Sequence, residues 1–183
     1  MKPSILFLGD SFTAGYGLFP EQSMTALIQK ELEAAAKDIQ VIPAGVSGDT
    51  TADALERLPR YLKRESSIAY AVLELGTNDF IQGFSVQAMR ENFKRIVSAL
   101  RQFNPTIQIF LMQMRMFPGF GVDEEYEAMY AQLAIELGLT LLPFPFTEVA
   151  GEPELNLTDG IHPNAKGMAI VAADVWASLR QYL

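Results

Sequence analysis

The chain has 183 residues, 49% of them hydrophobic and 20% charged, which is enough apolar material for one globular domain with its own core. Its net charge of −8, with scattered lysines and arginines, leaves no basic stripe for nucleic acid and disfavours tight binding to anionic membranes. The lack of cysteine excludes disulfides and thiolate catalysis, and a single histidine, His162, excludes a metal site built from several imidazoles.

Five short apolar runs predict the strands of a sheet, because they are rich in Val, Ile, Leu and Phe and show little polar alternation. In chain order they cover residues 5–8, 39–42, 69–75, 107–112 and 140–142. The first run follows MKPS almost at once, so we expect no signal peptide in this chain. A leader removed during maturation would leave the same N-terminus, so the compartment stays open. No apolar run approaches the length of a membrane span, and we expect no stable membrane anchor.

Helical periodicity occupies the segments between these runs. The predicted helices cover residues 21–36, 51–63, 86–103, 124–137 and 163–179. Thr50 followed by Asp53 resembles a capping box, whereas Pro59 is expected to kink or split the helix that this box begins. Gly138 is expected to cap the fourth helix, and Pro163 is expected to be the first residue of the last one.

The alternation of strands and helices predicts an α/β fold in which helices cover both faces of a parallel sheet, with right-handed crossovers. No linker, repeat or low-complexity segment divides the chain, so we expect a single domain over residues 1–183. In an open α/β sheet, ligands bind beyond the carboxyl ends of the strands. The segments that follow the strands are therefore the places to look for chemistry.

Polar clusters that contain glycine follow several of these strands. They are GDS at 9–11, PAGVSGDT at 43–50, GTNDF at 76–80 and DGIHP at 159–163. Each cluster alone is better explained as a turn or a helix cap, because Gly, Asp, Asn and Ser favour turns. Together they supply what acyl transfer to a serine requires, namely a nucleophile, a base, a group that orients the base, and donors for the oxyanion.

Ser11 can be the nucleophile, and His162 is the only imidazole that could serve as its base. Asp159 lies three residues before His162 and could accept the Nδ1–H, which would leave Nε2 to face Ser11. A histidine at the start of a helix is disfavoured as a cation by the helix dipole, so we expect a neutral imidazole near pH 7. The backbone N–H groups of Ser11 and Gly45 and the side-chain amide of Asn78 are the candidate oxyanion donors.

The segments GDSFTAGYG, AGVSGDTT, GTND and DGIHPN resemble, in this order, the four sequence blocks of the SGNH hydrolases, also called the GDSL lipase/esterase family. The resemblance spans nearly the whole chain. LMQMR at 111–115 and LLPF at 141–144 are similar to the branch that contains thioesterase I/protease I/lysophospholipase L1 enzymes and arylesterases. This resemblance implies a flavodoxin-like, three-layer, doubly wound fold with five parallel strands in the order 2-1-3-4-5. It also implies an esterase that acts on small ester or thioester substrates without a metal or a cofactor.

By position, the resemblance assigns the catalytic triad and the oxyanion hole to Ser11, Gly45, Asn78, Asp159 and His162. It makes Asp10 and Asp79 supports for the loops rather than chemical participants. One departure is Pro43, where relatives often have asparagine two residues before the glycine of the second block. Proline is tolerated mainly on edge strands, and the implied strand order places this strand at an edge.

A pocket for the acyl group is suggested by apolar residues near the expected site. Met114, Met116, Phe117 and Phe120 lie in a stretch punctuated by Gly and Pro without helical period, and Phe80 follows the asparagine of GTND. We interpret these side chains as a wall that would suit short- to medium-chain esters, thioesters or lysophospholipids, partly because methionine packs adaptably.

Three alternatives remain at this stage. A carbohydrate O-deacetylase would use the same catalytic residues, so the motifs do not separate it from an esterase. A metal-dependent phosphoesterase could use Asp10, Asp79, Asp159 and His162, although such sites usually contain more than one histidine. A flavodoxin-like binding module without enzymatic activity would need none of these roles. The composition does not decide the oligomeric state.

Overall fold

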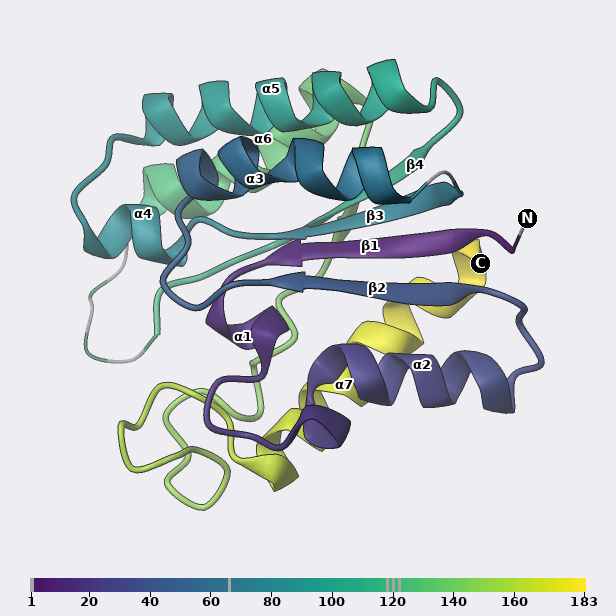
Figure 1. Cartoon of the computed structure of the whole chain (residues 1–183). Coiled ribbons are helices and arrows are strands. Elements are labelled where there is room, and N and C mark those ends of the chain that lie inside the picture. The colour runs from purple at the N-terminus through teal and green to yellow at the C-terminus, as the bar shows by residue number, and fades with distance from the viewer. Residues whose placement is uncertain (1, 66, 118, 120, 122) are drawn as a thin grey trace.

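Five parallel strands form one sheet in the order β2-β1-β3-β4-β5, which confirms the predicted architecture (Figure 1). The structure is a computed structural model that describes residues 2–65, 67–117, 119, 121 and 123–183. The strands are β1 (Ser4–Gly9), β2 (Gln40–Gly45), β3 (Ile68–Glu74), β4 (Gln108–Met112) and β5 (Thr140–Leu142). β2 continues through Pro43, which is tolerated because this strand lies at the edge of the sheet.

Helices cover both faces of the sheet (Figure 1). α3 (Thr51–Arg64), α5 (Val86–Phe103) and α6 (Glu124–Leu137) lie on one face, and α2 (Met24–Ala34) and α7 (Ala165–Leu179) lie on the other. The remaining described elements are the short helices α1 (Ser11–Ala14) and α4 (Thr77–Ile81) and the 3-10 turns η1 (Pro20–Gln22) and η2 (Arg180–Tyr182). Within the described residues, no helix combines the length and the hydropathy needed to cross a membrane.

The central strands form the middle of the core. All six residues of β1 are buried, and Leu6, Phe7 and Leu8 have no exposed surface. A strand covered by helices on both faces buries every side chain, which explains its continuous apolar sequence. Burying one such side chain fully contributes roughly 1.5–3 kcal/mol. The polar residues that follow β1 therefore stand on a rigid support.

Two short helices that periodicity did not predict begin directly after β1 and β3. α1 contains Ser11 and α4 contains Asn78, so each candidate lies in the first turn of a helix at the carboxyl edge of the sheet. With four and five residues, these helices are too short to show a helical period. Gly76 begins α4 with φ 115°, and a Cβ there would lie 2.2 Å from the Tyr130 hydroxyl oxygen. The close packing and the left-handed backbone both require glycine at this junction.

The last helix begins later than predicted. Its first residue is Ala165, and Asn164 is the N-cap, whose side chain accepts hydrogen bonds from the N–H groups of Lys166 and Gly167. Pro163 instead pairs with Asn156 in an isolated antiparallel bridge. The prediction of Pro163 as the first helical residue is therefore wrong, because the asparagine side chain satisfies the free N–H groups one residue further on.

Pro59 does not split α3, which runs without interruption from Thr51 to Arg64. The predicted capping box at its start is confirmed. Thr50 N donates to Asp53 Oδ2 at 2.9 Å, and Asp53 N donates to Thr50 Oγ1 at 3.3 Å. A proline removes only one hydrogen bond of the helical ladder, so packing against the sheet and against α5 can keep the helix continuous.

Candidate active site

The turn after β1 presents Ser11 with a free backbone N–H. Asp10 caps α1 by accepting the N–H of Phe12 through Oδ1 at 3.1 Å. The N–H groups of Thr13 and Ala14 are bonded to Glu74 Oε2 at 3.2 Å and to the Asp10 carbonyl oxygen at 2.9 Å. Among the described residues, none accepts the N–H of Ser11. The Ser11 N–H is therefore free in a turn whose neighbouring N–H groups are bonded, as an oxyanion donor must be.

The structure brings the three predicted triad residues together although Ser11 and His162 are 151 positions apart. His162 Nε2 lies 2.9 Å from Ser11 Oγ, and His162 Nδ1 lies 2.7 Å from Asp159 Oδ2. The other oxygen of Asp159 accepts the backbone N–H groups of Ile161 and His162, both at 2.9 Å. Asp159 therefore holds both the ring and the backbone of His162, which leaves Nε2 directed at the serine hydroxyl.

The Asp159 carboxylate is stabilised in its charged form. Partial burial acts to raise the pKa of Asp159, but hydrogen bonds from two backbone N–H groups and from the His162 ring outweigh it and lower the pKa. Asp159 is therefore ionised at neutral pH. An ionised partner is what a histidine base needs, because it stabilises the imidazolium that forms during reaction.

Aromatic rings that the sequence did not identify surround the imidazole. Tyr16 lies with its ring centroid 4.5 Å from that of His162, and Phe12 lies at 5.4 Å. Phe12 is buried and packs in turn on Phe117 at 5.0 Å and on Phe146 at 4.6 Å. These contacts limit the movement of the His162 ring. No short sequence pattern could have revealed them, because the rings come from separate segments.

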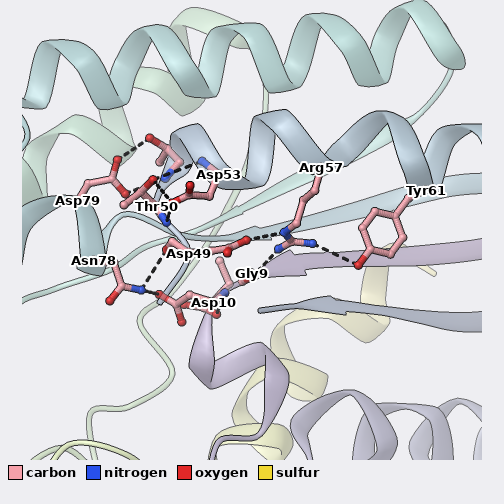
Figure 2. A network of polar contacts seen from close by, with 11 residues as sticks. Gly9, Asp10, Asp49, Thr50, Asp53, Arg57, Tyr61, Asn78 and Asp79 are labelled. Atoms are coloured by element: carbon pink, nitrogen blue, oxygen red, sulfur yellow. Dashed lines mark hydrogen bonds and ion pairs between the residues drawn. The ribbon is translucent and has the colours of Figure 1, made fainter. Parts of the chain in front are cut away.

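Arg57 of α3 joins the end of β1 to the loop after β2 (Figure 2). Its Nη2 donates to the carbonyl oxygen of Gly9 at 2.9 Å, and its Nε is paired with the Asp49 carboxylate. Both side chains are largely buried. A buried guanidinium needs such a partner, and losing either one would leave an uncompensated charge. Arg57 was not identified from the sequence. Its position eight residues after Asp49, two helical turns along α3, is the signal that could have pointed to this pair.

Asn78 lies beside the turn after β1 and the loop after β2 (Figure 2). Its Nδ2 donates to Asp10 Oδ2 at 3.2 Å and to the carbonyl oxygen of Asp49 at 3.0 Å. Both N–H bonds of this amide are therefore bound to protein acceptors. Donation to a substrate oxygen would require Asn78 to share or release one of these two hydrogen bonds.

The two aspartates expected to support loops both accept backbone N–H groups. Asp10 accepts from Phe12, and Asp79 accepts from Thr51 at 2.8 Å, which ties α4 to the start of α3. Burial raises the pKa of Asp79 despite its hydrogen bonds from Thr51. Asp10 and Asp79 are thus bonded away from Asp159 and His162, and within the described residues no cluster of three or more acidic or histidine side chains could hold a metal ion.

Gly45 and Gly48 occupy different environments. Gly45 is the last residue of β2, and a Cβ there would lie 2.3 Å from Ala14 N, so glycine is required for packing against α1. Gly45 also lines a cavity of about 430 Å³ between α2 and the edge strand, whose lining does not include Ser11, Asn78 or His162. Gly48 lies in the loop beyond β2 with φ 87°, and a Cβ there would meet open space.

The residues predicted to line an acyl pocket differ in burial. Met114 and Phe117 are buried in the core, and their part in an acyl pocket stays a prediction. Met116 and Phe80 are half-buried and pack against the same core. Phe120 lies outside the described residues. The ring of Phe117 packs against both Phe12 and Phe146.

The sequence profile of the GDSL-like lipase/acylhydrolase family matches residues 7–170. An arylesterase of Vibrio mimicus is 31% identical over 181 residues, which cover 98% of this chain and 89% of the relative. Thioesterase 1/protease 1/lysophospholipase L1 of Escherichia coli (strain K12) is 33% identical over 171 residues, with coverages of 92% and 79%.

The fold comparison agrees with the sequence comparison. The crystal structure of TesA superimposes with a TM-score of 0.91 at 31% identity, covering 98% of this chain and 99% of that one. The psychrotrophic esterase EstA from Pseudoalteromonas sp. gives a TM-score of 0.90 at 29% identity, with coverages of 98% and 97%. Sequence, fold and family profile lead to the same conclusion: the chain belongs to the GDSL-like lipase/acylhydrolase family.

Proposed function

We propose that the protein is a serine esterase that hydrolyses carboxylic esters and thioesters through an acyl-enzyme on Ser11. The observation that carries the proposal is the continuous chain of contacts from Asp159 through His162 to Ser11, at 2.7 and 2.9 Å. The relatives named arylesterase and thioesterase/lysophospholipase support aryl esters, thioesters and lysophospholipids as substrate classes.

In the first half of the reaction, Ser11 Oγ attacks the carbonyl carbon while His162 Nε2 takes its proton. Asp159 keeps the Nδ1–H in place and stabilises the positive ring. The tetrahedral intermediate collapses, His162 gives the proton to the leaving alcohol or thiol, and the acyl group stays on Ser11. In the second half, water attacks this ester with His162 again as base, and the carboxylic acid leaves. No step in this scheme calls for a metal or a cofactor.

The free N–H of Ser11 is the first oxyanion donor in this proposal, and the amide of Asn78 is another. For the remaining donor we favour Gly48 over the predicted Gly45, which faces the cavity beside α2. Gly48 is the chain neighbour of Asp49, whose carbonyl oxygen is bonded to Asn78. A glycine in open space allows a substrate to approach its backbone closely.

Exposed apolar side chains on the segments after β1, β2 and β3 favour acyl or aryl substrates over acetylated sugars. They are Tyr16, Val46, Ile81 and Phe84, each more than 40% exposed. Because these segments follow parallel strands, they gather at the same edge of the sheet as Ser11. This apolar rim is the observation that ranks an esterase above the deacetylase alternative.

A series of p-nitrophenyl esters tests the substrate class. We expect kcat/KM to rise by about tenfold as the acyl chain lengthens from two carbons to about six, since burying about two of the four added CH2 groups at about 0.8 kcal/mol each contributes about 1.6 kcal/mol. Acetylated xylose oligomers serve as the comparison. Hydrolysis of the sugar acetates without measurable activity on butyryl or hexanoyl esters would support the deacetylase instead.

Labelling with a fluorophosphonate tests the enzymatic function itself, because such probes react with activated serines. We expect peptide mapping to locate the label on Ser11, with no label in Ser11→Ala. Ser98→Ala, which removes an exposed serine of α5, is the matched control and should label like the wild type. An unlabelled wild-type protein that is folded would favour the binding-module alternative.

A further inference from the structure

Glu74, the last residue of β3, has a carboxyl group with no exposed surface beneath the nucleophile turn. Its Oε2 accepts hydrogen bonds from Thr13 Oγ1 at 2.8 Å, from Thr13 N at 3.2 Å and from Asp10 N at 3.4 Å. These backbone groups lie on either side of Ser11 in the chain. Glu74 therefore fixes the turn that leaves the Ser11 N–H free.

The fold leaves space for this carboxyl group. Gly9 lies opposite Glu74 in the β1–β3 register. A Cβ at position 9 would lie 2.0 Å from Thr13 Oγ1 and 2.7 Å from Glu74 Oε2. Any larger residue at position 9 would disrupt the contact between Thr13 and Glu74. The packing around Glu74 therefore requires glycine as the first residue of the GDS cluster.

The second oxygen of Glu74 has no hydrogen-bond donor. Oε1 is fully buried and lacks a partner among the described residues. The side chain of Asp10 is also fully buried and neighbours this carboxyl group, since the Asp10 N–H donates to Glu74 Oε2 at 3.4 Å. Two ionised carboxyl groups in this position would repel each other. A proton on Oε1 removes the repulsion and turns the unpartnered oxygen into a donor to Asp10.

The surroundings favour a bound proton. Burial raises the pKa of Glu74 well above its usual value, and the neighbouring Asp10 raises it further. Burial also raises the pKa of Asp10 to about 7, although hydrogen bonds from Phe12 N and Glu74 limit the rise. The other charged or titratable groups that face this pair are Asp49 with its partner Arg57, Asp79, Tyr126 and Tyr130. Burial raises the pKa of both tyrosines, so they stay neutral in the pH range considered below.

We propose that Glu74 is a positioning residue of the active site and acts in its protonated form. Its Oε2 holds the turn that presents Ser11, and its Oε1–H donates to the Asp10 carboxylate. Asp10 Oδ2 accepts from Asn78 Nδ2, so a single buried proton connects the nucleophile turn with the amide of the proposed oxyanion hole. The inference rests on the proposed function, because it requires Ser11 to be the nucleophile.

Glu74→Gln and Glu74→Ala separate this role from a general loss of packing. Glutamine can accept from Thr13 through its oxygen and donate to Asp10 through its NH2, as the protonated acid does. We expect Glu74→Ala to lower kcat by about 100-fold with little change in KM, and Glu74→Gln to rescue kcat to within about threefold of the wild type. An alanine variant that keeps its kcat, or a glutamine variant as impaired as alanine, would overturn the inference.

The dependence of kcat on pH in the alkaline range tests the proposal without requiring the Glu74→Ala variant to fold. When the wild type loses the shared proton, two carboxylates face each other beneath Ser11, and we expect kcat to fall by about fivefold as the pH rises through the raised pKa of Glu74. Glu74→Gln cannot ionise at this position, so its profile should stay flat over that range. An identical fall in both proteins would refute the role of the proton.

Glu136→Gln is the matched control, because it neutralises an exposed carboxylate on α6 that pairs with Arg90 and Lys94. This variant should keep the alkaline fall of the wild type. Fluorophosphonate labelling of the same samples distinguishes failure of the proposed esterase function from failure of the Glu74 inference. Failure of the proposed function would leave the wild type unlabelled, whereas failure of the Glu74 inference would leave labelling intact and change only the variant profiles.

Discussion

Replacement of His162 by alanine is expected to lower kcat by about 10⁴- to 10⁶-fold with KM within a few-fold of the wild type. The imidazole lies 2.9 Å from Ser11 Oγ, and the chain contains no other histidine that could take the serine proton. Since His162 contributes its ring mainly to this site, the variant should fold. The measurement is steady-state hydrolysis of a p-nitrophenyl ester together with thermal unfolding.

Two further variants make this result interpretable. Asp159→Asn keeps the size of the side chain but should still cost about 10²- to 10⁴-fold, because the uncharged amide no longer stabilises the imidazolium. Lys166→Ala, which removes an exposed cation from the first turn of α7, should behave like the wild type. A His162→Ala protein with more than a tenth of the wild-type kcat would exclude the imidazole as the base.

Replacement of Asn78 by alanine is expected to lower kcat by about 100- to 1,000-fold, which is the usual cost of losing one oxyanion donor. Within the described part of the chain the amide has two protein acceptors, Asp10 Oδ2 and the Asp49 carbonyl oxygen, and the substrate oxyanion would compete with them in the transition state. The loss should appear in kcat rather than in KM, because the interaction strengthens as charge develops on the oxygen.

Asn92→Ala is the matched control for Asn78→Ala. Asn92 is also a half-buried asparagine of this polar network, and its Nδ2 donates to Thr51 Oγ1 at 3.0 Å. Both variants should lose comparable stability, about 1–3 kcal/mol, because each leaves a partly buried acceptor without its donor. Only Asn78→Ala should lose kcat. Equal effects on kcat would show that Asn78 acts through stability alone.

The fold was largely predictable because its signals are local. Apolar runs covered on both faces and amphipathic stretches between them identified all five strands and the five longer helices. α1 and α4 were missed because four or five residues carry no periodic signal, and Pro163 was misassigned because the cap preference of Asn164 prevailed. Such boundaries depend on which side chain satisfies the free N–H groups at a helix end.

The candidate triad could be named from the sequence and stays a prediction, because the composition leaves one histidine and the turn sequences place Ser11 and Asp159 in suitable positions. The sequence pointed to Gly45 as an oxyanion donor, whereas we propose Gly48. The packing of Gly45 against α1, which gives this glycine a structural reason, could not be seen in the sequence. The burial of Met114 and Phe117 was not predictable either, since a segment without a helical period can still pack into the core.

The sequence by itself determined the α/β architecture, the absence of thiol chemistry and the small set of residues able to carry acyl transfer. Tertiary structure alone decided which groups meet, including the rings around His162 and the buried contact between Glu74 and Asp10. The physical reason is distance along the chain. Residue types and the periodicity of apolar residues can be read from consecutive positions. Burial and hydrogen-bond partners arise only when segments more than 60 positions apart pack together.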